Sequence, residues 1–203
     1  MNDAISWTAL LESSDVQNLI ALSLEEDIGG GDITTESCFP QPKVVEAQII
    51  ARTETIACGL PLAQYLFKRL DDSVEFISVA EEGQRIQPGK SLLHLKGNVR
   101  TLLTIERCAL NFLMRLCGIA TTARQASDAI PEGCRAKIYD TRKTTPGWRR
   151  LEKAAVQIGG AHNHRFGLFD AVLIKDNHIA AAGSIQDAIK QCRAQAPSGM
   201  TVQ

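Results

Sequence analysis

The chain has 203 residues, of which 44% are hydrophobic and 22% are charged, and its net charge is -1. These proportions are those of a globular protein and exclude disorder, collagen and coiled coils. No apolar run approaches the ~18–20 residues that span a bilayer, so we expect no membrane partner. The N-terminus has no basic stretch followed by an apolar core, so we expect no signal peptide and a cytoplasmic location. The six scattered cysteines form no CxxC pair, which predicts reduced, mostly buried thiols.

Charge is distributed unevenly along the chain. Residues 137–178 carry 8 basic side chains against 4 acidic ones, whereas residues 1–136 carry 12 basic against 18 acidic. The near-neutral total argues against a nucleic-acid partner, which usually meets a basic domain. The confined cationic stretch suits a small anionic ligand, although charge alone favours an ordinary solvated surface.

The first half of the chain mixes helical and strand patterns. Apolar spacing predicts an amphipathic helix over residues 15–26, with Asp15 as its N-cap. Glycines 29–31 follow in a tight turn, and because no strand precedes them a nucleotide-binding loop is the weaker interpretation. Strands are predicted over residues 43–55, 74–79 and 91–95, and a helix over residues 61–70.

The longest helical pattern runs from Val99 to Cys117. We expect Gly118 to end it and a separate helix to cover residues 121–130. Glu106 projects into the predicted apolar face and is expected to be paired or hydrogen-bonded, since a buried carboxylate needs a partner. A stripe of the helix beside that face contains Arg100, Arg107 and Arg115. Such a stripe is ordinarily a solvated surface, and a groove or a surface that contacts a partner is the alternative.

From residue 136 onward the pattern alternates between strands and helices. Strands are predicted over residues 136–140, 171–175 and 200–203, and helices over residues 148–158 and 184–196. This order is typical of parallel βαβ units. Because three parallel strands do not close a barrel, we expect the chain to be the front portion of a longer protein.

Three cationic clusters accompany these strands, at the end of the sheet where parallel α/β folds bind ligands. They are residues 140–147, which include Arg142 and Lys143, residues 162–165 and residues 175–178. Arginine offers a planar fork for a carboxylate or phosphate, and lysine offers a point charge. Each cluster alone is better explained as an ordinary loop, but together they favour one ligand with more than one acidic group.

The histidines in these clusters have other interpretations. Zinc binding by His162 and His164 is disfavoured, because no third ligand has suitable spacing. His178 is expected to cap a helix or to pair with a neighbouring carboxylate rather than to bind a ligand.

Five motifs resemble, in chain order, those of quinolinate phosphoribosyltransferase, the carboxylating nicotinate-nucleotide pyrophosphorylase family. They are Glu26–Thr35 (EDIGGGDITT), Glu106–Asn111 (ERCALN), Thr141–Gly147 (TRKTTPG), Asn163–Leu168 (NHRFGL) and Leu173–His178 (LIKDNH). The resemblance implies an N-terminal α/β sandwich domain over residues 1–118. The first part of an open α/β barrel, as in type II phosphoribosyltransferases, would follow over residues 119–203.

The family resemblance implies a reaction and a role for each site residue. Phosphoribosyl pyrophosphate and quinolinate would give nicotinate mononucleotide, pyrophosphate and CO2 in NAD biosynthesis. Arg142, His164 and Arg165 would bind the quinolinate carboxylates. Lys143 and Lys175 would be the catalytic lysines that hold anionic groups near the reacting carbon. Arg107 would reach into the partner's site in a homodimer.

The resemblance also implies a cofactor and leaves two alternatives. Mg2+ would accompany phosphoribosyl pyrophosphate, with its acidic protein ligands beyond Gln203 and none within this chain. His162 departs from the family's glycine run and receives no role. A molybdenum-transport-associated phosphoribosyltransferase homologue shares the Arg-Lys-Thr and Pro-Gly elements, but the motifs at residues 163–165 and 175–178 favour quinolinate. A non-catalytic anion-binding or dimerisation module is the alternative of a different class.

Overall fold

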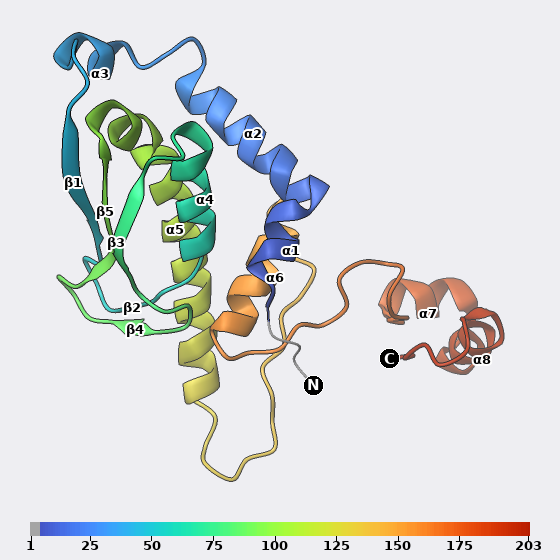
Figure 1. The fold of residues 1–203 in the computed structure, drawn as a ribbon. Coiled ribbons are helices and arrows are strands. Elements are labelled where there is room, and N and C mark those ends of the chain that lie inside the picture. The colour runs from blue at the N-terminus through green and yellow to red at the C-terminus, as the bar shows by residue number, and fades with distance from the viewer. Residues whose placement is uncertain (1–4) are drawn as a thin grey trace. The chain divides into compact units, whose positions relative to one another are not determined.

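A computed structural model describes residues 5–203 of the chain. Residues 1–4, which form part of the N-terminus expected to lack a signal peptide, lie outside the described residues. The chain divides into two compact units (Figure 1). The first contains residues up to Asp140 together with residues 144–162, and the second contains residues 141–143 and 163–203. The predicted domain division at residues 118/119 stays a prediction.

The described part of the first unit contains six helices. They are α1 (Trp7–Glu12), α2 (Ser14–Ile28), α3 (Ile33–Cys38), α4 (Leu60–Leu70), α5 (Val99–Asp128) and α6 (Arg149–Ile158). The helices predicted over residues 61–70 and 148–158 are therefore confirmed as α4 and α6. Hydroxyl and carboxylate caps explain two of the starts: Ser6 Oγ accepts from Ala9 N, and Asp32 Oδ1 accepts from Thr35 N.

The start of α2 corrects one expectation. The helix begins at Ser14, after the N-cap residue Ser13, so the predicted N-cap at Asp15 is wrong. The Asp15 carboxylate lies in the first turn and accepts two hydrogen bonds from Arg150 Nε, at 3.0 and 2.9 Å. Burial works against its charge, but the bonds from Arg150 and Ser13 outweigh this and lower its pKa.

Three strands form an antiparallel sheet in the order β1-β5-β3. They are β1 (Val44–Ile50), β5 (Ser91–Asn98) and β3 (Glu75–Val79), so the strands predicted at residues 74–79 and 91–95 are confirmed. The strand predicted over residues 43–55 is confirmed only as far as Ile50, because its partner β5 begins opposite that residue, at Ser91. The chain then forms a separate ribbon from β2 (Thr55–Ile56) and β4 (Arg85–Ile86).

Helix α5 runs without interruption through Gly118, so the predicted break there and the separate helix over residues 121–130 are wrong. A Cβ placed on Gly118 would meet none of the described residues within 4 Å. The neighbouring Cys117 and Ala120 are buried. Tertiary packing on both sides of the glycine thus maintains the helix against its low intrinsic propensity.

The buried face of α5 also differs from the predicted one. Ile105, Phe112 and Leu116 are fully buried, whereas Leu103, Glu106 and Met114 are exposed. The helix packs against α2, α3, α4, α6 and three strands along its length. Several neighbours therefore decide which side is buried, and a single amphipathic face is a poor description of such a helix.

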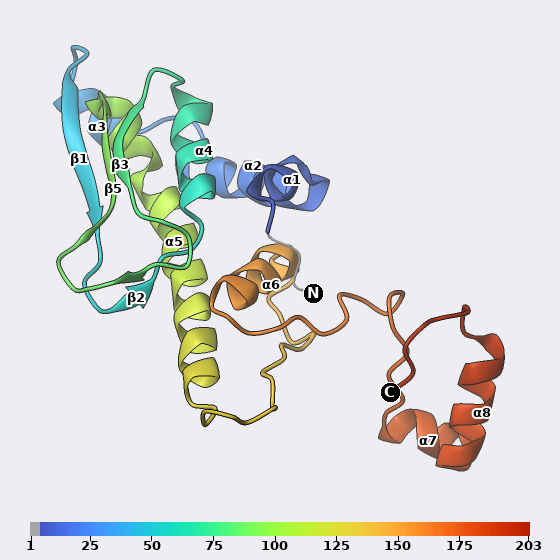
Figure 2. The same ribbon diagram turned by 60° about the horizontal axis from the view of Figure 1, so that its bottom comes forward.

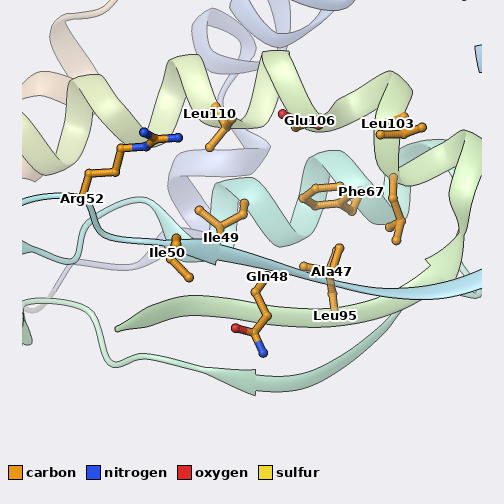
Figure 3. A pocket seen from close by; sticks show the side chains of 11 residues that line it. Ala47, Gln48, Ile49, Ile50, Arg52, Phe67, Leu95, Leu103, Glu106 and Leu110 are labelled. Carbon is orange, nitrogen blue, oxygen red and sulfur yellow. The ribbon is translucent and has the colours of Figure 1, made fainter. Parts of the chain in front are cut away.

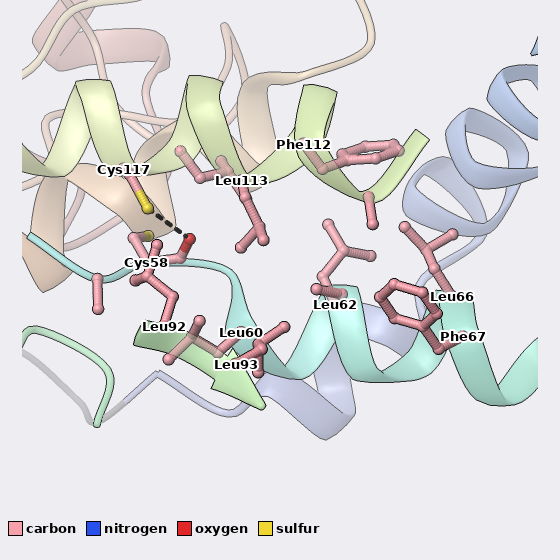
Figure 4. Close-up of a cluster of buried hydrophobic side chains, with 14 of the residues drawn as sticks. Cys58, Leu60, Leu62, Leu66, Phe67, Leu92, Leu93, Phe112, Leu113 and Cys117 are labelled. Carbon is pink, nitrogen blue, oxygen red and sulfur yellow. Dashed lines mark hydrogen bonds between the residues drawn. The ribbon is translucent and has the colours of Figure 1, made fainter. Parts of the chain in front are cut away.

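The core of the first unit lies where α4 and α5 meet the sheet (Figure 4). Leu62 and Leu66 of α4 pack with Phe112 of α5 and Leu93 of β5, and all four are fully buried. The Cys117 thiol donates a hydrogen bond to the Cys58 carbonyl oxygen at 3.4 Å (Figure 4).

All six cysteines are unpaired, as expected, but only half of them are buried. The buried ones are Cys58, Cys108 and Cys117, whereas Cys38 and Cys134 are exposed and Cys192 is half-buried. Burial raises the pKa of the Cys108 and Cys117 thiols to about 11. These two groups are therefore inert thiols that pack as small apolar side chains.

The second unit contains α7 (Asp176–Ala182) and α8 (Ile185–Gln195), which pack against each other (Figure 2). The helix predicted over residues 184–196 is confirmed as α8, and Ser184 Oγ accepts from Asp187 N at its start. The strands predicted at residues 171–175 and 200–203 appear only as one isolated parallel bridge between Val172 and Val202.

The strand predicted at residues 136–140 is likewise reduced to one parallel bridge, between Tyr139 and His162 in the first unit. Asp140 N donates to His162 O at 3.0 Å, and His162 N donates to Ile138 O at 2.9 Å. The Val172–Val202 bridge has the predicted parallel direction, whereas the Tyr139–His162 bridge involves a residue for which no strand was predicted. Neither extends into a ladder, because a strand with one short partner leaves most of its backbone groups unpaired.

Throughout residues 5–203, helices are too short or too polar to cross a membrane.

Candidate anion-binding site

Arg142 and Lys143 occupy the loop that follows Asp140 and belong to the second unit. Arg142 is half-buried, and its Nε is buried without a hydrogen-bond partner among residues 5–203. Lys143 is exposed, and its backbone N donates to Thr141 Oγ1 at 3.1 Å. A local turn thus holds the Lys143 backbone and leaves its side chain in solvent.

His164 and Arg165 form hydrogen bonds with each other and with residues of neighbouring segments. His164 Nδ1 accepts from Arg165 N at 2.8 Å, and His164 Nε2 lies 2.7 Å from Gln203 Oε1. Because Nδ1 accepts, the ring proton of a neutral His164 is on Nε2, which donates to Gln203. Arg165 Nη1 donates to Ala171 O at 3.0 Å, whereas Arg165 Nε is buried and makes no hydrogen bond within the described residues.

Lys175 is exposed and is the N-cap residue of α7. Its backbone N donates to His178 Nδ1 at 2.9 Å, and His178 N donates back to Lys175 O at 2.8 Å. The expectation that His178 acts as a cap is therefore confirmed. This reciprocal pair fixes the Lys175 backbone at a helix start.

Five of the six predicted site residues belong to the second unit, namely Arg142, Lys143, His164, Arg165 and Lys175. Backbone hydrogen bonds from Ile174 N to Gln203 O and from Gln203 N to Val172 O join the two segments of its bridge. Through Gln203 and Ala171, His164 and Arg165 are attached to this same bridge. Lys175 follows it directly.

The second unit is cationic, with 6 basic side chains against 3 acidic ones. Two of the acidic side chains are engaged with backbone or hydroxyl groups: Asp170 accepts from Phe166 N and Gly167 N, and Asp187 from Ser184 Oγ. None of the six basic side chains, which include Arg142, Lys143, Arg165 and Lys175, forms an ion pair with any of residues 5–203. The unit thus presents positive charge that its own carboxylates do not neutralise.

Arg107, the sixth predicted residue, lies on α5 in the first unit and is exposed. The other arginines of its stripe are engaged: Arg100 Nε donates to Phe39 O at 2.6 Å, and Arg115 binds Glu152. Arg107 makes no side-chain hydrogen bond to the described residues. It lines a hollow of about 320 Å³ together with Asp27 and Asp32.

The glycine-rich segment 26–35 packs beside Arg107. Asp32 caps α3, and its Oδ2 accepts from Thr104 Oγ1 of α5 at 3.2 Å. The hydrogen bonds from Thr35 lower the pKa of Asp32, with Thr104 contributing less. The segment is therefore a turn and helix cap, as predicted, and it supports the part of α5 that carries Arg107.

Glu106 corrects a further expectation, because it is exposed rather than buried and paired. It lines a groove between β1 and α5 with apolar neighbours that include Ile49, Leu103 and Leu110 (Figure 3). The buried carboxylate of this region is instead Glu152 of α6, which is 8% exposed. Glu106 was expected to be buried because the predicted apolar face of α5 differs from the side of the helix that is buried in the structure.

The first unit contains two ion pairs that were not predicted from the sequence. Lys153 Nζ donates to Asp140 Oδ1 and Oδ2 at 2.8 and 2.7 Å, and Arg115 binds both Glu152 and Thr145. Lys153 is 4% exposed. One feature of the sequence could have indicated them: Glu152 and Lys153 lie between the apolar residues Leu151 and Ala154. Charged side chains that are buried with such apolar neighbours need partners of opposite charge.

Among residues 5–203, no three histidine, cysteine or acidic side chains gather as metal ligands do.

Family models match both halves of the chain. The model "Quinolinate phosphoribosyl transferase, N-terminal domain" matches residues 32–117, and the corresponding C-terminal domain model matches residues 119–203. The structure is similar to NadC from Streptococcus pyogenes, with a TM-score of 0.87 and 41% identity over 92% of this chain and 67% of that one.

Two curated relatives have similar identities. A probable nicotinate-nucleotide pyrophosphorylase [carboxylating] of Bacillus subtilis is 46% identical over 83% of this chain and 57% of its own length. A protein of the same name from Synechocystis is 46% identical over 89% of this chain and 60% of its own length. The chain thus spans less than two thirds of the length of these two relatives.

Proposed function

The chain belongs to the quinolinate phosphoribosyltransferase family, and from this premise we propose the activity of the whole protein. It transfers the phosphoribosyl group of phosphoribosyl pyrophosphate to quinolinate with loss of CO2, and it yields nicotinate mononucleotide and pyrophosphate for NAD biosynthesis. Its place of action is the cytoplasm.

One observation carries this proposal furthest: all six basic side chains of the second unit lack an ion-pair partner among the described residues. Two of them, Arg142 and Arg165, also bury an Nε–H that has no acceptor within residues 5–203. A buried donor without an acceptor costs about 1–3 kcal/mol. Carboxylate oxygens of quinolinate would remove that cost and neutralise the charge, which accounts for the presence of such groups in an otherwise folded unit.

The residue types fit the proposed chemistry. Arg142 and Arg165 offer forks to the two carboxylates, and His164 offers a further polar contact. As the bond to pyrophosphate breaks, positive charge develops on the ribose and negative charge on the leaving group. The ammonium groups of Lys143 and Lys175 stabilise the latter and hold the nucleophile in place.

The reaction requires no general base. The pyridine nitrogen of quinolinate carries no proton at neutral pH, so it attacks the ribose carbon directly. Once this nitrogen is quaternary, it stabilises the electron pair that remains on the adjacent ring carbon when the bond to CO2 breaks, and this carbon then takes a proton from water. The chain's residues therefore bind and orient two anions rather than move protons.

We further propose that Mg2+ accompanies phosphoribosyl pyrophosphate. The diphosphate oxygens of phosphoribosyl pyrophosphate are hard donors of the kind that Mg2+ prefers, and the ion would neutralise part of their charge.

The protein acts as a homodimer in which Arg107 completes the partner subunit's site. Its exposure and its lack of a side-chain hydrogen bond within residues 5–203 support this role, because its neighbours Arg100 and Arg115 are both engaged.

The test uses the purified protein with quinolinate, phosphoribosyl pyrophosphate and Mg2+. We expect equal amounts of pyrophosphate and CO2, both dependent on quinolinate. Arg142→Met should abolish both products, whereas the control Arg193→Met, an exposed residue in the last turn of α8, should not. Pyrophosphate release that does not depend on quinolinate would reject the proposed acceptor.

A further inference from the structure

The loop that carries Arg142 and Lys143 is held at its start by a buried ion pair. Asp140 immediately precedes the loop, and both of its carboxylate oxygens accept from Lys153 Nζ of α6. The side chains of Lys153 and Asp140 are 4% and 8% exposed. The Asp140 backbone is also fixed, since its N donates to His162 O. The residue before Thr141 is therefore held through both its side chain and its backbone.

The far end of the loop is held by a second ion pair. Arg115 of α5 binds Glu152, with its Nε 3.1 Å from Glu152 Oε1, and it also donates to the hydroxyl of Thr145. The guanidinium lies over the Trp148 ring, 5.2 Å from the ring centre. This ring packs in turn against Phe112. The Arg115 head is thus fixed on two sides, which fixes Thr145.

The two ion pairs originate from adjacent residues of one helix. Glu152 and Lys153 follow each other in α6, carry opposite charges and are both buried. Glu152 binds Arg115, which contacts Thr145 at the end of the loop, and Lys153 binds Asp140 at its start. Arg149, also on α6, donates from Nε to Thr144 Oγ1 at 3.0 Å.

Only Thr141, Arg142 and Lys143 lie between these anchored ends. They belong to the second unit, while Asp140 and Thr144 on either side belong to the first. A segment of three residues whose two ends are fixed has few backbone conformations available to it. The backbone of Arg142 and Lys143 is therefore restricted to a small set of conformations.

We propose that the Asp140–Lys153 and Glu152–Arg115 ion pairs form a clamp that positions Arg142 and Lys143 for their anionic ligand. The four clamp residues act through the backbone of the loop and are positioning residues. This inference deepens the proposed function and rests on it for the identity of the ligand. Buried ion pairs contribute little net stability, and a positioning role gives a reason for the cost of burying the charges of Asp140, Glu152 and Lys153.

The first experiment measures hydrogen–deuterium exchange in peptides that cover residues 141–147. Lys153→Met removes the ammonium and keeps the length of the side chain, and Glu152→Ala releases Arg115. We expect either change to accelerate amide exchange in this segment by about tenfold or more, because exchange reports local opening. The control is Arg150→Met, which removes an ion pair of the same helix, to Asp15 of α2. It should leave exchange in the segment unchanged.

The second experiment measures the quinolinate dissociation constant of the same variants by calorimetry. We expect Lys153→Met to weaken binding by about tenfold, since small displacements of binding groups have large effects. Arg150→Met should bind like the wild type. Circular dichroism establishes that each variant is folded. Should Lys153→Met fail to fold because it leaves Asp140 buried without its counter-ion, the double variant Asp140→Asn, Lys153→Met removes both charges and is judged by the same criteria.

The outcomes separate the clamp from the proposed function. Accelerated exchange with weakened quinolinate binding supports both. Unchanged exchange in folded Lys153→Met overturns the clamp, whatever happens to binding. Accelerated exchange in a protein whose wild type does not bind quinolinate rejects the proposed ligand and leaves the clamp supported.

Discussion

At the scale of single residues, Glu82 shows how burial and hydrogen bonding compete. Its carboxylate accepts from Leu60 N at 2.7 Å and from Gly59 N and Trp7 Nε1 at 3.1 Å, so it caps the start of α4 and ties α1 to it. Burial nevertheless dominates these hydrogen bonds and raises its pKa above the ordinary value. The group is a structural cap whose charged form is disfavoured by folding.

This raised pKa predicts a pH dependence of stability. Between the ordinary and the raised pKa, the folded state binds more protons than the unfolded state, so the Glu82 contribution to the free energy of unfolding falls as pH rises through that window. In Glu82→Gln this fall should be absent. The free energy of unfolding of the wild type should therefore decrease relative to that of the variant as pH rises from about 4.5, the ordinary pKa of the group. Urea unfolding at several pH values measures it. Glu81→Gln, an exposed neighbour, is the control, and a constant difference for Glu82→Gln would contradict the assignment.

Arg142 gives a residue-scale prediction about binding. Arg142→Lys keeps the charge but loses the planar fork, so we expect quinolinate affinity to fall by about 1.5–3 kcal/mol. Titration calorimetry measures the loss, with Arg193→Lys on α8 as the matched exposed control. An unchanged affinity would remove Arg142 from the site.

At the scale of elements, two glycines near the α5–α6 contact differ in their surroundings. Gly118 lies within α5, and a Cβ there would meet nothing among the described residues within 4 Å. Gly159 ends α6, and a Cβ there would lie 2.6 Å from Ala123 Cβ and too close to the Ala120 carbonyl of α5. The second glycine therefore allows α6 to approach α5 closely.

These surroundings predict substitutions of opposite sign. Gly118→Ala should stabilise the protein by about 0.5–1 kcal/mol, because alanine loses less backbone entropy in a helix. Gly159→Ala should destabilise it by about 1–3 kcal/mol through overpacking. Urea unfolding of both variants measures the two effects. If Gly159→Ala were neutral, the close packing of α6 on α5 would be wrong.

Element-level prediction from the sequence succeeded where local pattern decides and failed where packing decides. Helix α8 and strand β3 follow from periodicity. The continuity of α5 through Gly118 and the exposure of Glu106 depend on neighbouring elements that periodicity does not encode. The parallel bridge between His162 and Tyr139 was not predicted, because the residues around His162 show no alternation of apolar and polar side chains.

The site shows the same division. Arg142, Arg165 and Lys175, which the motifs selected, lie in one cationic unit of the structure. The Asp140–Lys153 and Arg115–Glu152 pairs could not be predicted, since their partners are 13 and 37 residues apart in sequence. Long-range pairing of charges is a product of the tertiary fold.

At the scale of the whole molecule, the proposed role of Arg107 predicts complementation between subunits. Arg107→Ala and Lys175→Ala should each be inactive as homodimers. Mixed dimers should recover part of the activity, because one of the two sites then receives an intact Lys175 and an intact Arg107. Activity assays on demonstrated heterodimers measure this, and no recovery in them would argue against a shared site.

The central claim is that this cationic unit recognises two carboxylates on one pyridine ring. The most direct measurement is calorimetric titration with quinolinate and, separately, with nicotinate, which has a single carboxylate. We predict that quinolinate binds at least about tenfold more tightly, since the second carboxylate gains a charge-assisted hydrogen bond of its own. Equal affinities for the two acids would contradict the account.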